Sequence, residues 1–171
     1  PEPEPVVAEL PYEIDFTATQ EGWNAVDKSE TPGTTWAVAT GTAMGGSYTT
    51  VKVATDFNSA TDDYYVSPAF SFEEGAKYKV SVKAFDPVWS GTHAEFSILY
   101  GNSADNVTAY STIAEKIAVD YNTYDYTGNG ASKLPVIEYE FTSEFTGQCC
   151  VALHVASLVG VQNTEIFTFA I

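Results

Sequence analysis

The sequence predicts an all-β protein: a two-sheet antiparallel β-sandwich with jelly-roll topology. Three observations lead to this fold class. Apolar and polar residues alternate with period two in several stretches of the 171-residue chain, turn-forming Gly and Asn residues separate these stretches, and no helical pattern repeats between them. Because a parallel βαβ arrangement needs helices between its strands, we expect about nine strands paired into two stacked sheets.

The clearest predicted strand is Lys77–Phe85. Its even-numbered positions from 78 to 84 are apolar, whereas lysines and a serine occupy the alternate positions, as expected for a strand with one buried and one hydrated face. Three more stretches repeat this pattern. They contain Phe96, Ile98 and Tyr100; Ile137, Tyr139 and Phe141; and Phe167, Phe169 and Ile171.

Further strands are expected between the turn signals, at Tyr12–Phe16, Ser47–Val53, Tyr64–Phe70 and Cys149–Val155. Residues 111–119 permit either a helix or a strand. Because the last predicted strand, which ends at Ile171, has the pattern of a buried strand, we expect it to pair with an early strand and close the domain.

The chain is expected to form one domain over residues 10–171, preceded by a linker over residues 1–9. A domain of this size buries most of its apolar surface, and a composition of 44% apolar and 18% charged residues is globular. The opening segment PEPEP favours an extended spacer, because alternating prolines cannot pair in a sheet. We hypothesise that an export signal and a lipid-attachment cysteine precede this spacer.

The charge of the chain excludes several classes of partner. The formal net charge is −16, from 23 acidic residues against 7 basic residues, all of them lysine. Nucleic-acid binding depends on neutralising phosphates with Lys and Arg, so we expect no nucleic-acid partner, and the same field repels an anionic membrane. No apolar run approaches the roughly 20 residues that cross a bilayer, so we expect no membrane insertion of this domain.

The sequence carries no motif of a familiar catalytic class. GxSxG, HExxH, P-loop, GxGxxG and CxxC motifs are absent, and we expect no catalytic residues and no enzymatic activity. His93 and His154 have no metal-binding spacing, and Cys149 and Cys150 are expected to be one buried thiol and one bystander. A glycoside hydrolase stays an alternative, because a chain with 23 acidic residues can place two carboxylates at a suitable separation.

Aromatic residues outside the alternating pattern form the candidate ligand site. One lies in a turn-like segment near residue 89, and three tyrosines crowd into a polar segment over residues 120–128. An aromatic face beside Asp and Asn suits a sugar, whose C–H face stacks while its hydroxyls form hydrogen bonds. The alternative is that these tyrosines fold back to cap one end of the sandwich. The candidate ligand-binding residues are Trp89, Tyr121, Asn122, Tyr124 and Tyr126.

Several landmarks, taken in order, resemble a known family. An early strand ending in Asp15-Phe16 leads to Gly22-Trp23 and then to Trp36, and the segment DDYYVSPAF follows at residues 62–70. This last segment resembles the D-W-L-hydroxyl-P-x-hydrophobic strand of the cleaved-adhesin and choice-of-anchor J domains of Bacteroidetes surface proteins. The resemblance spans residues 10–171 and implies a MAM-like or galactose-binding-like jelly roll.

The resemblance also bears on whether the chain binds calcium. Members of the family often carry an Asp/Gly-rich calcium loop between the two tryptophans, whereas residues 27–33 of this chain read DKSETPG. Calcium takes about six to eight oxygen ligands, and a lysine among few carboxylates disfavours such a cage. Structural calcium is therefore left open, with Asp27 and Glu30 as the candidate ligands.

Together these features predict a non-catalytic, adhesin-like extracellular module that recognises a glycan through loops at one end of the sandwich. The alternative is a protein–protein interaction or spacer domain of a surface lipoprotein, whose partner is a surface protein. The expected location is the outer-membrane surface, with anchoring through a segment N-terminal to residue 1.

Overall fold

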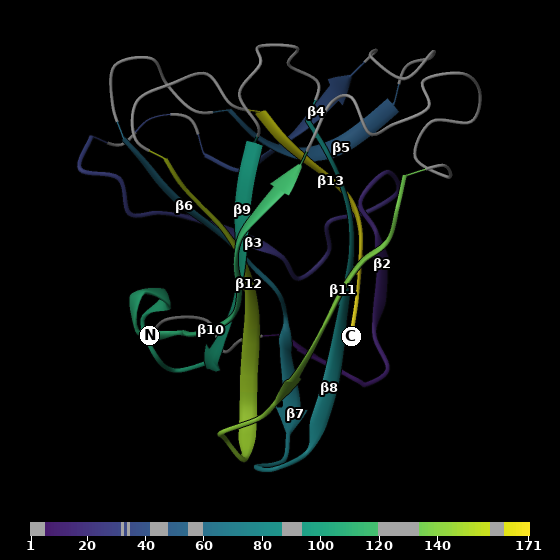
Figure 1. Ribbon diagram of the computed structural model, residues 1–171, viewed down its shortest axis with the longest axis vertical. Helices are drawn as coiled ribbons and strands as arrows, with labels where there is room; N and C mark the ends of the chain where they lie inside the picture. The colour runs from purple at the N-terminus through teal and green to yellow at the C-terminus, as the bar shows by residue number, and fades with distance from the viewer. Residues whose placement is uncertain are drawn as a thin grey trace.

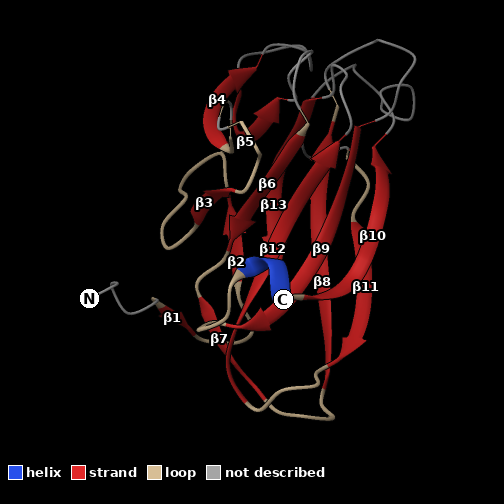
Figure 2. Ribbon diagram, turned by 90° about the vertical axis from the view of Figure 1, so that its left-hand side faces the viewer, coloured by secondary structure: helices blue, strands red, loops and turns tan. Residues whose placement is uncertain are grey.

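Two stacked β-sheets make up the structure, a computed structural model that describes residues 6–31, 33, 35–41, 48–54, 60–86, 94–119, 134–157 and 163–171. The strands pair antiparallel, except for one short parallel pair at the N-terminal end of the described chain. Figures 1 and 2 show a sandwich built almost entirely of strand. A single turn of 3-10 helix, η1 (Val107–Ala109), is the only helix within the described ranges. The predicted all-β sandwich is therefore confirmed.

We call the two layers sheet A, with seven strands, and sheet B, with six. Sheet A contains β1 (Val7–Ala8), β3 (Asn24–Asp27), β6 (Thr61–Val66), β7 (Ala69–Phe72), β9 (Ala94–Asn102), β10 (Ser111–Val119) and β12 (Gly147–Ser157). Sheet B contains β2 (Glu13–Asp15), β4 (Ala37–Gly41), β5 (Tyr48–Ala54), β8 (Lys77–Phe85), β11 (Ile137–Thr142) and β13 (Asn163–Ala170).

Each sheet is organised around one long central strand. In sheet A, β12 pairs with β9 on one side and with both β6 and β7 on the other, while β10 lies beyond β9 and β3 beyond β6. In sheet B, β13 pairs with β8 on one side and with β5 and β2 on the other. The pairing of β13 with β2 confirms that the C-terminal strand joins an early strand.

Most predicted strands lie where the alternation placed them. β8 has the predicted bounds, and the open question over residues 111–119 is resolved as strand β10. The sequence missed β3 and β4, which are short and lie at the edges of their sheets. β1 lies within the range predicted as a linker, where it adds to β7 in parallel. The alternation also overstated the burial of β11, an edge strand in which Tyr139 is 37% exposed.

The predicted strand Tyr64–Phe70 is in fact two strands, separated at Ser67-Pro68. Proline has no N–H to donate to the ladder, so the pairing with β12 must break there. The Ser67 side chain supplies the missing hydrogen-bond partner. Its Oγ accepts a hydrogen bond from Val151 N at 2.9 Å and donates one to Pro68 O at 2.7 Å. Ser67 N in turn donates to Val151 O. Both the N–H and the C=O of Val151 are therefore hydrogen-bonded despite the break.

Aromatic rings fill the part of the core around Tyr65 of β6. Tyr65 stacks on Trp23 and on Trp36, with ring centroids 5.1 and 5.7 Å apart. Both indoles are buried and both donate a hydrogen bond, from Trp23 Nε1 to the Tyr12 hydroxyl and from Trp36 Nε1 to the backbone oxygen of Asp63. Buried Trp needs such a partner for its N–H. The two tryptophans are therefore structural.

Candidate functional site

The sequence-predicted ligand site, comprising Trp89, Tyr121, Asn122, Tyr124 and Tyr126, lies outside the described residues. Its prediction stays untested. The strand ends that lead into the two segments are described, and they are neighbours: Ala94, which follows residues 87–93, pairs directly with Val119, which precedes residues 120–133.

The calcium candidates lie at the end of β3. Asp27 accepts hydrogen bonds from Ser29 N at 2.8 Å and from Gly33 N at 3.1 Å. The Ser29 hydroxyl, together with these two backbone N–H groups, holds the pKa of the Asp27 carboxyl below the usual range. Glu30 is exposed. Within the described ranges, no group of three or more His, Cys, Asp or Glu side chains is arranged to hold a metal ion. Calcium binding remains a prediction.

The face of sheet A that points away from sheet B is covered by the η1 segment over one half and open over the other. In the covered half, Val107 of η1 and the partly buried Tyr110 pack on Tyr64, Leu99 and Ala152. Gly101 of β9 makes this cover possible, because a Cβ at that position would lie 2.4 Å from Cδ1 of Tyr110. Ser97 and His154, which pair across β9 and β12, lie two residues further along these strands than Leu99 and Ala152.

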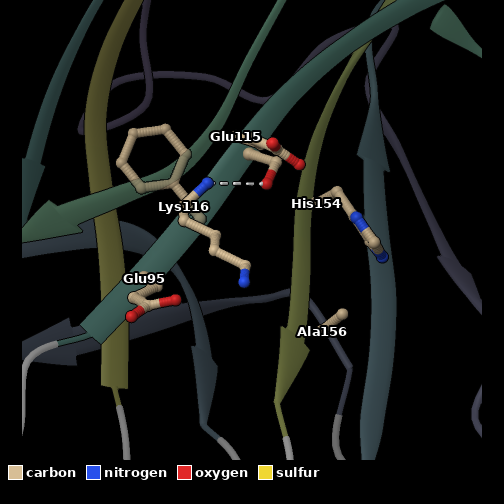
Figure 3. Close-up of a pocket in the computed structure, with 7 residues that line it drawn as sticks. Glu95, Glu115, Lys116, His154 and Ala156 are labelled. Atoms are coloured by element: carbon tan, nitrogen blue, oxygen red, sulfur yellow. Dashed lines mark hydrogen bonds between the residues drawn. The ribbon is translucent and has the colours of Figure 1, made fainter. Parts of the chain in front are cut away.

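An open depression of about 200 Å³ occupies the other half of this face, and we call it the sheet A depression (Figure 3). Three adjacent strands supply its walls: β9, β10 and β12. Apart from Phe96 and Ala156, its lining side chains are polar or charged. The lining residues are Glu95, Phe96, Ser97, Glu115, Lys116, His154 and Ala156.

A β-bulge in β10 shapes one wall of the depression. Ala114 pairs with Ile98 and Ile117 with Phe96, so two residues of β10, Glu115 and Lys116, stand opposite Ser97. Lys116 has a φ of 53°, in the left-handed region that non-glycine residues seldom occupy. Its backbone N–H donates a hydrogen bond to Ser97 Oγ at 3.2 Å, which fixes the bulge to β9. Bulges of this kind turn a side chain away from the direction that regular pairing would give it.

On the opposite wall, His154 is held in place by two neighbours from β6. Its ring stacks on Tyr64 with centroids 4.0 Å apart, and its Nε2 lies 2.7 Å from Asp62 Oδ1. Burial, together with the nearby Asp62, raises the pKa of Tyr64 to about 12, so this phenol stays neutral. The imidazole is therefore held both through its ring face and through Nε2.

The charged groups of the depression face one another without pairing. Figure 3 shows the Lys116 side chain crossing the depression, with Glu95 on one side and His154 on the other. Among the described residues, the ion pairs within 4.0 Å are Lys79–Glu138 and His154–Asp62, so the Lys116 ammonium pairs with neither glutamate of the depression. Donors and acceptors are left for a ligand.

Ser97, His154 and Asp62 share one face of sheet A, which invites comparison with a catalytic triad. The imidazole is bonded to Asp62 and stacked on Tyr64, and no hydrogen bond joins it to Ser97. Ser97 Oγ instead accepts from the backbone of Lys116. A nucleophile needs a base within hydrogen-bond reach, so the serine is not activated in this arrangement.

A second notable carboxylate belongs to Asp63 of β6, in the same sheet as the depression. Asp63 is fully buried, and neither of its oxygens has a hydrogen-bond partner in the described structure. Burial raises the pKa of its carboxyl to about 6, and the neighbouring carboxylates Asp27 and Asp62 add to the rise. The Thr35 hydroxyl opposes the shift, although its geometry falls short of a hydrogen bond. Because no surface of Asp63 is exposed, a substrate cannot reach it.

The two cysteines are both buried, so the expectation of one buried thiol and one bystander is wrong. Cys149 faces the core, while Cys150 lies on the other face of β12 near Tyr110. Burial raises the pKa of both thiols, that of Cys150 to about 11. The Tyr110 cover, which the sequence did not reveal, explains why the outward-facing thiol is also protected.

Comparisons with known proteins identify the fold. No protein-family model and no curated protein sequence matches the chain. Among solved structures, the K1 cleaved adhesin domain of Lys-gingipain from Porphyromonas gingivalis W83 is similar, with a TM-score of 0.66 and 14% identity over 93% of this chain and 95% of that chain. The K3 cleaved adhesin domain of the same protein matches with a TM-score of 0.61 and 15% identity, over 94% and 95% of the two chains. The fold is therefore that of the cleaved adhesin domains, as the sequence resemblance implied.

Carbohydrate-binding modules share this fold as well. TmCBM61, solved in complex with β-1,4-galactotriose, superposes with a TM-score of 0.54 and 10% identity, over 91% of this chain and 92% of that chain. Separately, no helix in the described ranges is long and apolar enough to cross a membrane.

Proposed function

We propose that this chain, which has the fold of the cleaved adhesin domains, is an extracellular, non-catalytic binding module whose ligand is a glycan. The observation that carries the proposal is the sheet A depression, where an ammonium, two carboxylates, a hydroxyl and an imidazole meet on an open face. A sugar hydroxyl both donates and accepts hydrogen bonds, so a pyranose ring can satisfy neighbouring groups of both kinds at once.

The acidity of the chain and its fold support the same reading. A net charge of −16 repels nucleic acids and anionic membranes but leaves an uncharged sugar unaffected. Solved modules of this fold include one bound to β-1,4-galactotriose. Attachment at the outer surface of the cell, through a segment that precedes residue 1, belongs to the same proposal.

A glycan array tests the proposal, followed by calorimetric titration of each sugar that binds, with and without calcium. We expect binding by the wild type, and binding about tenfold weaker in Glu115→Gln, because a charge-assisted hydrogen bond is lost. The matched control is Glu140→Gln, which removes an exposed carboxylate from β11 on the other sheet. Absence of binding to every sugar, or equal weakening in both variants, would count against a glycan site in the depression.

The same samples test the absence of catalysis. Incubation of the wild type with each bound oligosaccharide should release no reducing sugar. Release that is lost in Glu115→Gln would instead identify a glycoside hydrolase.

A further inference from the structure

We propose that the sheet A depression selects uncharged sugars with adjacent hydroxyl groups over acidic sugars, with Lys116 as the hydrogen-bond donor to the sugar and Glu95 and Glu115 as the groups that repel anions. This inference rests on the glycan-binding function proposed above and names the class of its ligand. Three observations support it: the left-handed backbone of Lys116, the glutamates around it with which it forms no ion pair, and the negative net charge of the whole chain.

The backbone conformation at position 116 is energetically unfavourable for a lysine. A φ of 53° suits glycine, and next to it asparagine, whereas a long side chain with a Cβ is strained there. Regular pairing of β10 with β9 would avoid this conformation, and the bulge imposes it. At this strained residue the lysine side chain extends into the depression, between Glu95 and His154 (Figure 3).

The unpaired charges of the depression match a neutral polyol. Glu95 and Glu115 only accept hydrogen bonds, and the Lys116 ammonium only donates them. Adjacent hydroxyls of one sugar ring can donate to a carboxylate and accept from the ammonium at the same time. The ring then joins groups that do not reach one another directly, since no ion pair connects Lys116 to either glutamate among the described residues.

Acidic ligands fit less well than neutral ones. A uronic acid would gain one contact with the ammonium but would meet two carboxylates in a chain of net charge −16. A cationic peptide would be attracted by the carboxylates and repelled by Lys116. The glutamates and the net negative charge thus disfavour anions, and repulsion of this kind contributes to the specificity of a binding site.

The test compares Lys116→Gly with the wild type, using β-1,4-galactotriose and xylotriose as neutral probes and trigalacturonate as the acidic probe. Glycine removes the ammonium and tolerates the left-handed backbone, so we expect an unchanged or higher Tm together with neutral-sugar binding weaker by about tenfold. Lys116→Asn, which also tolerates this backbone, should weaken binding in the same way. Lys77→Gln, which removes an exposed lysine from sheet B, should bind like the wild type.

A double variant tests the exclusion of anions. Glu95→Gln combined with Glu115→Gln should bind trigalacturonate more tightly than the wild type does, by about tenfold. The NMR signals of His154, one of only two histidines in the chain, should shift when a neutral sugar binds to the wild type.

The outcomes separate the two proposals. If the wild type binds no sugar, the glycan function fails and the specificity assignment fails with it. If the wild type binds a neutral sugar and both Lys116 variants bind it equally well, only the role of Lys116 is refuted. Preference of the wild type for trigalacturonate over both neutral probes would refute the ligand class.

Discussion

Replacing the buried Asp63 with asparagine should change how stability depends on pH. Asp63 has no exposed surface and no hydrogen-bond partner in the described structure, so its ionised form is uncompensated. Its pKa is about 6 in the folded protein, against the ordinary value of 3.8 expected after unfolding. A group whose pKa is raised by folding stabilises the fold fully below its unfolded pKa, and this contribution is lost as the pH rises through the folded pKa.

The size of the effect follows from the two pKa values. The difference between about 6 and 3.8 corresponds to about 3 kcal/mol of stability that the wild type loses between about pH 3.8 and pH 7. An asparagine has nearly the same shape and never ionises. Asp63→Asn should therefore be more stable than the wild type by up to about 3 kcal/mol at neutral pH, and this advantage should disappear as the pH falls below about 4.

Urea unfolding followed by tryptophan fluorescence, repeated from about pH 4 to about pH 8, measures both curves. Asp105→Asn, which removes an exposed carboxylate, is the control and should not gain the stability at neutral pH that Asp63→Asn gains. A variant that is less stable than the wild type at neutral pH would refute the reasoning. A calcium-dependent rise in Tm that is lost in Asp63→Asn would then show that the carboxylate holds a cation.

Other predictions concern the packing around β12. Ser67→Ala should lower the free energy of unfolding by about 2 kcal/mol, because Val151 N–H loses its buried acceptor; urea unfolding measures this, and the exposed Ser71→Ala should have no such effect. Gly101→Ala should cost about 1 to 3 kcal/mol in the same assay, since its Cβ would collide with the Tyr110 ring, and an unchanged stability would disprove that contact. Both cysteines should resist a thiol reagent in the native state and react once urea unfolds the chain; rapid native labelling would contradict their burial.

The fold could be predicted because alternation reports directly on a strand with two different faces. β8 carries lysines on one face and apolar residues on the other, so its bounds followed from the sequence. β3 and β4 carry no such contrast, because Val38 of β4 is 55% exposed and β3 has no fully buried side chain. The break at Ser67-Pro68 was present in the sequence as a motif, but its role became clear only from the pairing with β12.

The sheet A depression could not be predicted, because its residues come together only through register. His154 meets Ser97 and Tyr64 through pairing with strands that lie far away in the sequence, and taken alone it reads as an ordinary strand residue. The bulge at Lys116 also left no signal, since a glycine or an asparagine would mark a left-handed position and a lysine does not. The sequence indicated instead the aromatic residues of the segments around positions 89 and 120–128.

An NMR titration of the isotopically labelled protein with a neutral oligosaccharide that binds tests the central claim most directly. Our account predicts that the amide signals of residues 95–97 and 115–116 and those of His154 shift with ligand concentration, and that Lys116→Gly abolishes these shifts. Shifts confined to residues 87–93 and 120–133, with those three segments of sheet A unaffected, would contradict it and would place the ligand on the segments that contain Trp89 and Tyr121.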